Sequence, residues 1–205
     1  MILYNTVKKE AIAEQIIERS RFITRIKPVE TKEEADAFIA SVRKANRDAT
    51  HNVPAMVIGD QFQIQWASDD GEPQGTSGAP IVQYLVKEGI TNVVLVVTRY
   101  FGGIKLGTGG LVRAYTSSAR LGVEAAGIRV VKKKYYLTVS LAYPFLARVE
   151  NMCRETGFEI LDIVYTDVVT MEIVTEIGGK EELRKRLTDI TGGTEKIVSE
   201  VEKNA

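Results

Sequence analysis

Hydrophobic and polar residues alternate through two runs near the start of the chain, residues 7–14 and residues 16–29. This period of two predicts two β-strands, although the first run also fits a short helix. Thr31 and Glu34 then form a capping box, and the apolar residues that follow recur at helical spacing as far as Asn46. The pattern predicts an amphipathic helix, which needs a sheet against which to bury its apolar face.

Further strands follow this predicted helix. Residues 52–58 and 61–66 flank Gly59-Asp60 and predict a β-hairpin. Residues 93–98 form a β-branched run that is typical of a strand buried on both faces. Strands and helices mixed in this way predict an α+β fold.

Two glycine-rich loops each lead into a predicted helix. Residues 68–80, SDDGEPQGTSGAP, precede one helix, and residues 99–110, RYFGGIKLGTGG, precede a second helix that stops at Gly127. Nine of the 17 glycines lie within residues 71–110. This concentration indicates that special backbone geometry or close backbone approach is required there.

The pattern restarts at Tyr135 and predicts a second domain. Its strands and helices follow one another in the order βαββαβ, which is the ferredoxin-like plan. The three lysines at residues 132–134 mark the predicted boundary. We therefore expect two domains, residues 1–134 and residues 135–205.

The second glycine-rich loop is the strongest candidate for a binding site. A strand, a glycine-rich turn and a helix start aim free backbone N–H groups and the positive end of a helix dipole at one place, where an anion or a nucleic-acid phosphate fits. Neither the Walker A nor the Rossmann spacing is met, and glycines that pack a helix on a sheet give the same pattern. The residues predicted to bind the anion are Arg99, Gly102, Gly103, Lys105, Gly107, Thr108, Gly109, Gly110, Arg113 and Arg120.

The first glycine-rich loop carries three carboxylates, Asp69, Asp70 and Glu72. Such a group can supply oxygen ligands for Mg²⁺ or a general base, whereas Asp-Asp-Gly is also ordinary turn chemistry. His51 is the only histidine, and it is expected to be a polar site residue or a hydrogen-bonded structural residue. No catalytic set is recognised, and we predict no metal site and no cofactor.

Three aromatic residues lie near the ends of predicted strands. Trp66, Tyr100 and Phe101 would stack on bases if they were exposed, but aromatic residues at such positions also belong to cores.

Charge is distributed unevenly along the chain. The 27 basic and 27 acidic residues cancel, but residues 1–134 carry +5 and residues 135–205 carry −5. Residues 89–134 alone carry +7. Such a stretch is the electrostatic footprint of a polyanion contact, and a solvated helix face gives the same signal.

Composition and cysteine content indicate the compartment. The 205 residues are 44% hydrophobic and 26% charged, as in ordinary globular proteins. Cys153 is the only cysteine, so no intrachain disulfide forms, which fits a reducing interior. No signal peptide or membrane-spanning apolar stretch is found. We expect a cytoplasmic protein without membrane contact.

Two long motifs resemble the signature of the YigZ/IMPACT family. They are DDGEPQGTSGAP at residues 69–80 and VVTRYFGGIKLGTGGLVRAYTSSA at residues 96–119, with RSRFIT at residues 19–24 and ATHN at residues 49–52 as weaker matches. The whole chain fits the bacterial, YigZ-like arrangement. The resemblance implies a first domain with the fold of domain 2 of a small-subunit ribosomal protein, shared with elongation factor G and GHMP kinases. It implies a second domain like the ferredoxin-like last domain of elongation factor G.

The resemblance also implies a link to translation. Eukaryotic IMPACT restrains the amino-acid-starvation kinase of translation initiation, partly through an RWD domain that this sequence lacks. The leading hypothesis is a non-enzymatic regulator that contacts RNA, the ribosome or a translation protein. The alternatives are an enzyme or sensor for a nucleotide or phosphorylated metabolite, with Mg²⁺ held by the loop acids, and a protein-interaction module without a small ligand.

Overall fold

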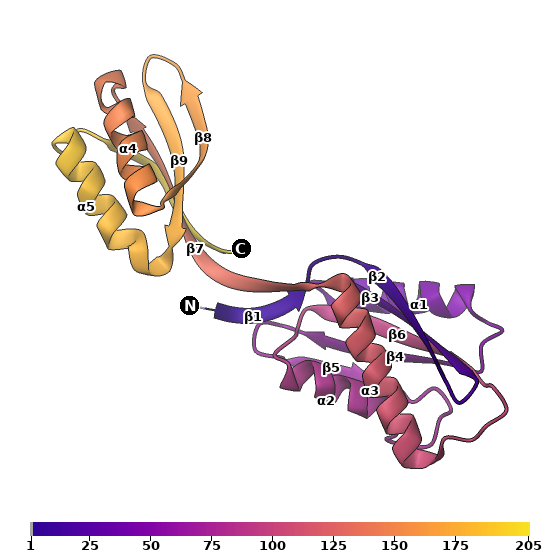
Figure 1. Cartoon of the computed structure of the whole chain (residues 1–205). Coiled ribbons are helices and arrows are strands. Elements are labelled where there is room, and N and C mark those ends of the chain that lie inside the picture. Colours follow the sequence, from indigo (N-terminus) through magenta and orange to yellow (C-terminus); the bar gives the residue numbers. More distant parts are fainter. Residues whose placement is uncertain (1) are drawn as a thin grey trace. The chain divides into compact units, whose positions relative to one another are not determined.

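A computed structural model describes residues 2–205, which form two compact units (Figure 1). The first unit is Tyr4–Val130, and the second contains Val131–Ala205 together with Ile2 and Leu3. The chain divides between residues 130 and 131, whereas the sequence predicted a division after Lys134. The three lysines at 132–134 are strand residues: Lys133 and Lys134 pair with neighbouring strands, and the backbone of Lys132 bonds to Ala205.

The first domain is built on a five-stranded antiparallel sheet in the order β2-β3-β6-β4-β5. The strands of the sheet are β2 (Ala11–Ile17), β3 (Ser20–Pro28), β4 (His51–Ile58), β5 (Ile64–Ala67) and β6 (Val93–Tyr100). The predicted hairpin of β4 and β5 and the central position of β6 are confirmed.

The first alternating runs of the sequence divide differently from the prediction. A strand that precedes the sheet, β1 (Ile2–Val7), ends before β2 begins at Ala11. A tight turn at Glu18 and Arg19, both with positive φ, separates β2 from β3. The alternation of the sequence continues through these turns and therefore did not reveal them.

Three helices cover the two faces of this sheet (Figure 1). The helices are α1 (Lys32–Ala45), α2 (Gly78–Lys87) and α3 (Gly107–Ala126). Strand β6 alternates between them: Val93, Leu95 and Val97 join the core beneath α2 and α3, while Val94 and Val96 pack with α1. This alternation explains why β6 reads as a continuous apolar run.

The start of α1 confirms the predicted capping. The Thr31 side chain accepts a hydrogen bond of 3.2 Å from the backbone N–H of Glu34. The Glu34 carboxylate in turn accepts a bond of 2.8 Å from the backbone N–H of Glu30. Two free N–H groups are satisfied in this way.

The second domain has the predicted ferredoxin-like plan. It consists of β7 (Ile128–Leu141), α4 (Leu146–Thr156), β8 (Glu159–Tyr165), β9 (Val169–Glu176), α5 (Lys180–Thr191) and β10 (Lys196–Asn204), with short 3₁₀ turns at Tyr143–Phe145 and Ile177–Gly179. Strand β7 lies between β9 and β10, β8 flanks β9, and β1 also pairs with β7. Leu137, Met171 and Leu183 are fully buried in a core of its own. The α+β, two-domain architecture is thus established.

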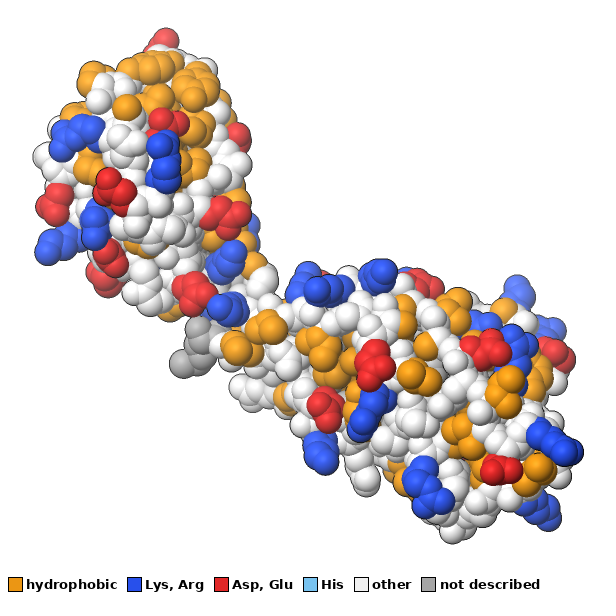
Figure 2. Space-filling view, viewed as in Figure 1, with side chains coloured by type: hydrophobic (Ala, Val, Ile, Leu, Met, Phe, Trp, Pro, Cys, Tyr) orange, Lys and Arg blue, Asp and Glu red, His pale blue; other side chains and the backbone are white. Residues whose placement is uncertain are grey.

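The surface of the second domain exposes apolar side chains near the hairpin of β8 and β9. Val164, Tyr165 and Val168 are between 41% and 58% exposed there, and Figure 2 shows orange side chains gathered at this end of the domain. Among the helices of residues 2–205, none is long and apolar enough to cross a lipid bilayer.

Candidate functional site

Both glycine-rich loops lie at one edge of the first-domain sheet. Because the strands are antiparallel, β3 and β4 begin at the edge where β6 ends, and His51 at the start of β4 is the register partner of Arg99 in β6. The loops of residues 68–77 and 101–106 connect this edge to α2 and α3. The fold therefore brings together two motifs that are separated in sequence by a helix and a strand.

A buried ion pair between Glu72 and Arg99 lies at the centre of this edge. Nη1 of Arg99 donates a hydrogen bond of 2.7 Å to Oε1 of Glu72, and the Tyr115 hydroxyl donates a second bond of 2.7 Å to the same oxygen. All three residues are buried. They join the first loop, β6 and α3 into one hydrogen-bonded unit.

Arg99 is enclosed on its other sides as well. Its Nη2 donates a hydrogen bond of 3.2 Å to the Ser20 hydroxyl, and its guanidinium lies 5.3 Å from the ring centre of Phe22 and 5.4 Å from that of Phe101. Only 4% of Arg99 is exposed. The structure corrects the prediction that Arg99 binds an external anion, because strand alternation turns its side chain inward and Glu72 balances its charge.

Tyr115 is a neutral hydrogen-bond donor in this cluster. Burial raises the pKa of the Tyr115 hydroxyl, and its hydrogen bond to Glu72 raises that pKa further. The phenol therefore stays protonated at neutral pH and donates a hydrogen bond to the Glu72 carboxylate.

His51 lies at the rim of the same cluster. Its Nδ1 is 2.8 Å from the backbone carbonyl oxygen of Asp70, so this nitrogen carries the hydrogen and donates it. Its Nε2 is 3.7 Å from Oε2 of Glu72, and 19% of the side chain is exposed. The set of Ser20, His51, Glu72, Arg99 and Tyr115 is called the Glu72 cluster below.

Asp69 closes the first loop over the start of α2. Its carboxylate accepts hydrogen bonds from the Ser77 hydroxyl and from the backbone N–H groups of Gly75, Ser77 and Gly78, at 2.7 to 3.2 Å. Burial acts to raise the pKa of Asp69, but these hydrogen bonds outweigh burial and lower the pKa below its ordinary value. Asp69 is a helix-capping and loop-closing residue.

Asp70 binds a different set of groups. It accepts a hydrogen bond of 2.6 Å from the backbone N–H of Asn52 and one of 2.9 Å from Nη2 of Arg43. Asp69, Asp70 and Glu72 thus serve three separate sets of donors. Among residues 2–205, no group of three acidic, His or Cys side chains is placed to hold a metal ion. The hypothesis that these acids together bind Mg²⁺ is not supported.

Glycine is required for different reasons at different positions of the second loop. A Cβ at Gly102 would lie 2.0 Å from the backbone carbonyl carbon of Arg19, so the β2–β3 turn packs directly on this glycine. Gly107 has a φ of +71°, in the region that favours glycine. Gly103 also has positive φ, and a Cβ there would meet nothing within 4 Å.

At Gly109, a Cβ would meet only the Arg113 guanidinium, at 3.7 Å, and φ is not positive. Neither packing nor conformation therefore requires glycine at position 109.

The first turn of α3, residues 107–110, is an open helix N-terminus. Its N-cap residue Leu106 makes no side-chain cap, and the turn contains no acidic residue. Gly107, Thr108 and Gly109 are exposed, so their free N–H groups face solvent. This arrangement retains the main physical feature of the predicted anion site.

Two cations accompany this turn. Lys105 and Arg113 are exposed and form no ion pair with any residue from 2 to 205. A cavity of about 450 Å³ beside the turn is lined by Lys105, Gly110, Arg113 and Ser117, with Glu18 as its one acidic residue. Lys105, residues 107–110 and Arg113 are called the α3 anion site below.

The other predicted cations are distributed elsewhere. Arg120 lies 13 residues beyond Gly107, about 20 Å along the helix, and its guanidinium is 5.8 Å from the ring centre of Tyr84. Lys132, Lys133 and Lys134 pair with Glu176, Glu202 and Glu159 of the second domain. The +7 stretch is therefore not one continuous surface.

Sequence reasoning missed the role of Tyr115 and Ser20. Tyr115 lies on the buried face of α3 and was not among the predicted site residues. A hydroxyl on a buried face needs a hydrogen-bond partner, which was the available signal. Its partner Glu72 lies 43 residues earlier, and sequence spacing did not link the two.

These features define a two-domain α+β protein with a polar cluster buried beneath two glycine-rich loops. The Impact N-terminal domain family matches residues 18–123, and a domain of unknown function (DUF1949) matches residues 139–194. The chain is 41% identical to the IMPACT family member YvyE of Bacillus subtilis, over 95% of this chain and 89% of that protein. It is 32% identical to the IMPACT family member YigZ of Escherichia coli, over 89% of this chain and 91% of that protein. The chain belongs to the IMPACT family.

A solved structure supports the same fold. A crystal structure described as that of a hypothetical protein shares 30% identity and covers 96% of each chain, with a TM-score of 0.60.

Proposed function

We propose that this protein is a non-enzymatic, translation-associated binding protein that contacts RNA, free or within the ribosome, through the α3 anion site. The observation that carries the proposal is the exposed, uncapped first turn of α3 beside two cations without acidic partners. Free helix N–H groups bind one phosphate, and Lys105 and Arg113 extend the contact to neighbouring phosphates.

An aromatic residue near the start of the same loop favours RNA over a single small anion. Phe101 follows β6 directly, and 46% of it is exposed. Its ring also lies near the buried Arg99 guanidinium, which holds it in place. An exposed, fixed ring is a platform on which an unpaired base stacks.

The Glu72 cluster supports binding rather than catalysis. The polar groups of Glu72 and Tyr115 already bind one another, and Arg99 is buried with them. A general acid or base must reach a substrate proton. Because these residues are buried and bonded to one another, they stabilise the shape of the two loops. The RNA then contacts the exposed first turn of α3.

Binding of the full chain to single-stranded RNA tests the proposal. We expect affinity to fall linearly on a log–log plot against salt. The double variant Lys105→Ala/Arg113→Ala should bind at least tenfold more weakly, and its salt slope should be shallower by about 0.7 for each phosphate that the variant no longer neutralises. Fluorescence anisotropy of labelled RNA at several salt concentrations measures both quantities.

A matched control removes two exposed cations from the second domain. Arg154 and Lys185 lie on α4 and α5, and neither forms an ion pair with a described residue. Arg154→Ala/Lys185→Ala should bind RNA like the unmodified chain. Absence of RNA binding at low salt, or an equal loss in the control, would contradict the proposal.

The cavity beside the α3 turn favours a second candidate, a sensor of a small phosphorylated metabolite or nucleotide. About 450 Å³ accommodates such a ligand, and Lys105, Arg113 and Ser117 line the space. A thermal-shift panel of nucleotides and sugar phosphates tests this candidate. A ligand at 100 times its dissociation constant should stabilise the protein by ~2.7 kcal/mol, and a flat panel would reject this candidate.

A further inference from the structure

One face of the first-domain sheet is only partly covered. Helices α2 and α3 cover the opposite face, whereas α1 packs on residues of β4 and β6. On the α1 side, β2 exposes two isoleucines: 62% of Ile12 and 69% of Ile16 are accessible. Glu14, which lies between them on the same face, is paired with Arg21 at 2.6 Å, so the two isoleucines are separate apolar positions on this face.

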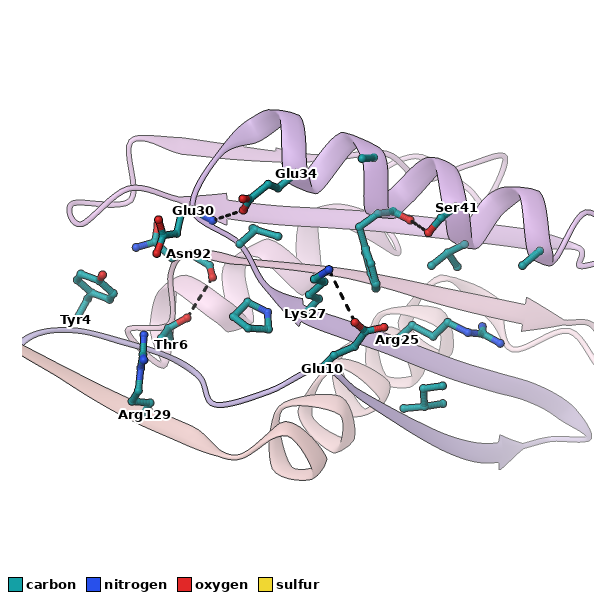
Figure 3. A pocket seen from close by; sticks show the side chains of 17 residues that line it. Tyr4, Thr6, Glu10, Arg25, Lys27, Glu30, Glu34, Ser41, Asn92 and Arg129 are labelled. Carbon is teal, nitrogen blue, oxygen red and sulfur yellow. Dashed lines mark hydrogen bonds and ion pairs between the residues drawn. The ribbon is translucent and has the colours of Figure 1, made fainter. Parts of the chain in front are cut away.

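A groove of about 900 Å³ separates α1 from this open part of the sheet (Figure 3). Ile12 of β2 and Val29, which follows β3, line it together with the α1 residues Phe38 and Val42. Figure 3 shows Ser41 and Glu34 on the α1 side and Arg25, Lys27 and Glu10 on the strand side. The groove is therefore bounded by a helix on one side and two strands below.

The part of the sheet that α1 leaves open is two strands wide, which suits a second helix. Strands β2 and β3, each occupying ~4.8 Å of the sheet, together present a surface about 10 Å wide, which is the diameter of an α-helix. The wall of α1 presents Ala37, Ser41 and Ala45 to the groove, spaced four residues apart along one line of the helix. Small side chains let a neighbouring helix approach within ~8 Å of the α1 axis.

Charge along the groove gives the docked helix a direction. Glu30 and Glu34 lie near the start of α1, with Arg129 at the same end of the groove (Figure 3). Towards the end of α1 lies Arg25, whose Nη1 donates a hydrogen bond of 3.3 Å to Thr98 and which forms no ion pair with a described residue. Lys27 and Glu10 between them are 3.9 Å apart and balance each other.

An antiparallel helix complements this distribution. Its N-terminal half, with acidic residues, would lie against Arg25, and its negative C-terminal end would lie near Arg129 with basic side chains toward Glu30 and Glu34. Antiparallel orientation also sets the dipole of the incoming helix favourably against that of α1.

We propose that the α1 groove docks an amphipathic α-helix of a partner protein, which runs antiparallel to α1. The helix has acidic residues in its N-terminal half, basic residues in its C-terminal half, and isoleucine or leucine side chains against Ile12 and Phe38. This surface is distinct from the α3 anion site, and it does not depend on RNA binding.

Peptide selection on the immobilised full chain tests the proposal. The probe is a phage-displayed library of 18-residue helical peptides in which the charges of each half are randomised. We expect enrichment of peptides with the stated charge order, and reversal of that order in a synthetic peptide should weaken binding at least tenfold.

Two neighbouring α1 variants locate the binding surface. Ser41→Arg fills the groove and should weaken binding of a selected peptide more than tenfold. Ala40→Arg adds the same side chain at an exposed α1 position that does not line the groove, and it should bind normally. Ile12→Glu, at an exposed strand position that lines the groove, should reproduce the loss. Thermal melting establishes that each variant is folded.

Three outcomes would overturn the proposal. The first is enrichment of no peptide, or of peptides that bind Ser41→Arg and Ala40→Arg equally. The second is self-association of the full chain in sedimentation that Ser41→Arg abolishes, which would make a second copy the occupant. The third is loss of RNA binding in Ser41→Arg but not in Ala40→Arg, which would assign this face to RNA.

Discussion

At the scale of single residues, Glu72 accepts two hydrogen bonds on one buried carboxylate oxygen, from Arg99 and from Tyr115. A buried ion pair contributes little net stability when both charges are present, but removal of one partner leaves the other charge uncompensated. The Glu72 cluster thus fixes the geometry of both glycine-rich loops. Loss of either partner should affect the whole edge of the sheet.

We predict that Glu72→Ala lowers the free energy of unfolding of the first domain by about 3–5 kcal/mol, because Arg99 stays buried without a counter-charge. Tyr115→Phe should lower it by about 1.5–3 kcal/mol, because one hydrogen bond to a charged group is removed. Urea denaturation followed by circular dichroism measures both. Glu155→Ala, at an exposed α4 position, is the control. A Glu72→Ala loss below about 1 kcal/mol would contradict this role.

Asp69 makes stability depend on pH. Its pKa in the folded protein lies below its ordinary value, so its stabilising contribution is present above a pH of about 4 and is lost as the pH falls through the lowered pKa. Asp69→Asn should lower the melting temperature at pH 7 and flatten its decline in acid. Thermal melts between pH 2.5 and 7 measure this. Asp167→Asn at an exposed turn should keep the full decline, and an unchanged profile in Asp69→Asn would be contrary to expectation.

The residue chemistry was only partly predictable from sequence. Asp-Asp-Gly was recognised as turn chemistry, and Asp69 indeed caps α2. The inward direction of Arg99 was not predictable, because an apolar run such as β6 buries both faces and gives no alternation to follow. The partner of Arg99, Glu72, lies 27 residues away, and only the folded sheet brings them together.

At the scale of elements, local signals predicted helices better than turns. The Thr31 capping box marked the start of α1, and Gly127 marked the end of α3. The turn at Glu18 and Arg19 was missed because two non-glycine residues adopt positive φ there, which sequence statistics disfavour. A helix start without a cap, as at α3, is unfavourable for the helix alone and calls for another explanation.

Substitution of Gly109 tests whether the first turn of α3 is left open in order to bind a phosphate. Gly109→Ala should stabilise α3 by about 0.5–1 kcal/mol, because alanine favours the helix and a Cβ there has space. The same Cβ narrows the approach of a phosphate to the helix N–H groups, so RNA binding should weaken at least threefold. Thermal melting and anisotropy measure the two effects. Gly178→Ala, where a Cβ would meet nothing within 4 Å, should leave RNA binding unchanged. If Gly109→Ala stabilised the protein without weakening RNA binding, Gly109 would not belong to the α3 anion site.

At the scale of the whole molecule, the folded units reduce the charge asymmetry that the sequence indicated. Division after residue 130 moves Lys132, Lys133 and Lys134 into the second domain, where each pairs with a glutamate. Residues 4–130 then carry +2, and residues 131–205 carry −2. Attraction of RNA therefore depends on the local α3 anion site more than on the net charge of a domain.

The family and the two-domain α+β fold were accessible from sequence because the two glycine-rich motifs are long and the βαββαβ pattern is regular. The position of the binding surface was less accessible, since equally basic residues differ in burial and pairing. Lys105 is exposed and unpaired among the described residues, Arg99 is buried, and Lys133 is paired. Only three-dimensional packing distinguishes these three environments.

Titration of the isotopically labelled full chain with single-stranded RNA, followed by backbone amide NMR, tests whether the first turn of α3 binds RNA. The amide signals of Gly107, Thr108, Gly109 and Gly110 should show the largest shifts, because these N–H groups face the bound phosphate. The shifts should diminish as salt is raised. Unchanged signals from these four amides, with RNA-dependent shifts confined to other parts of the chain, would contradict the claim that α3 binds RNA.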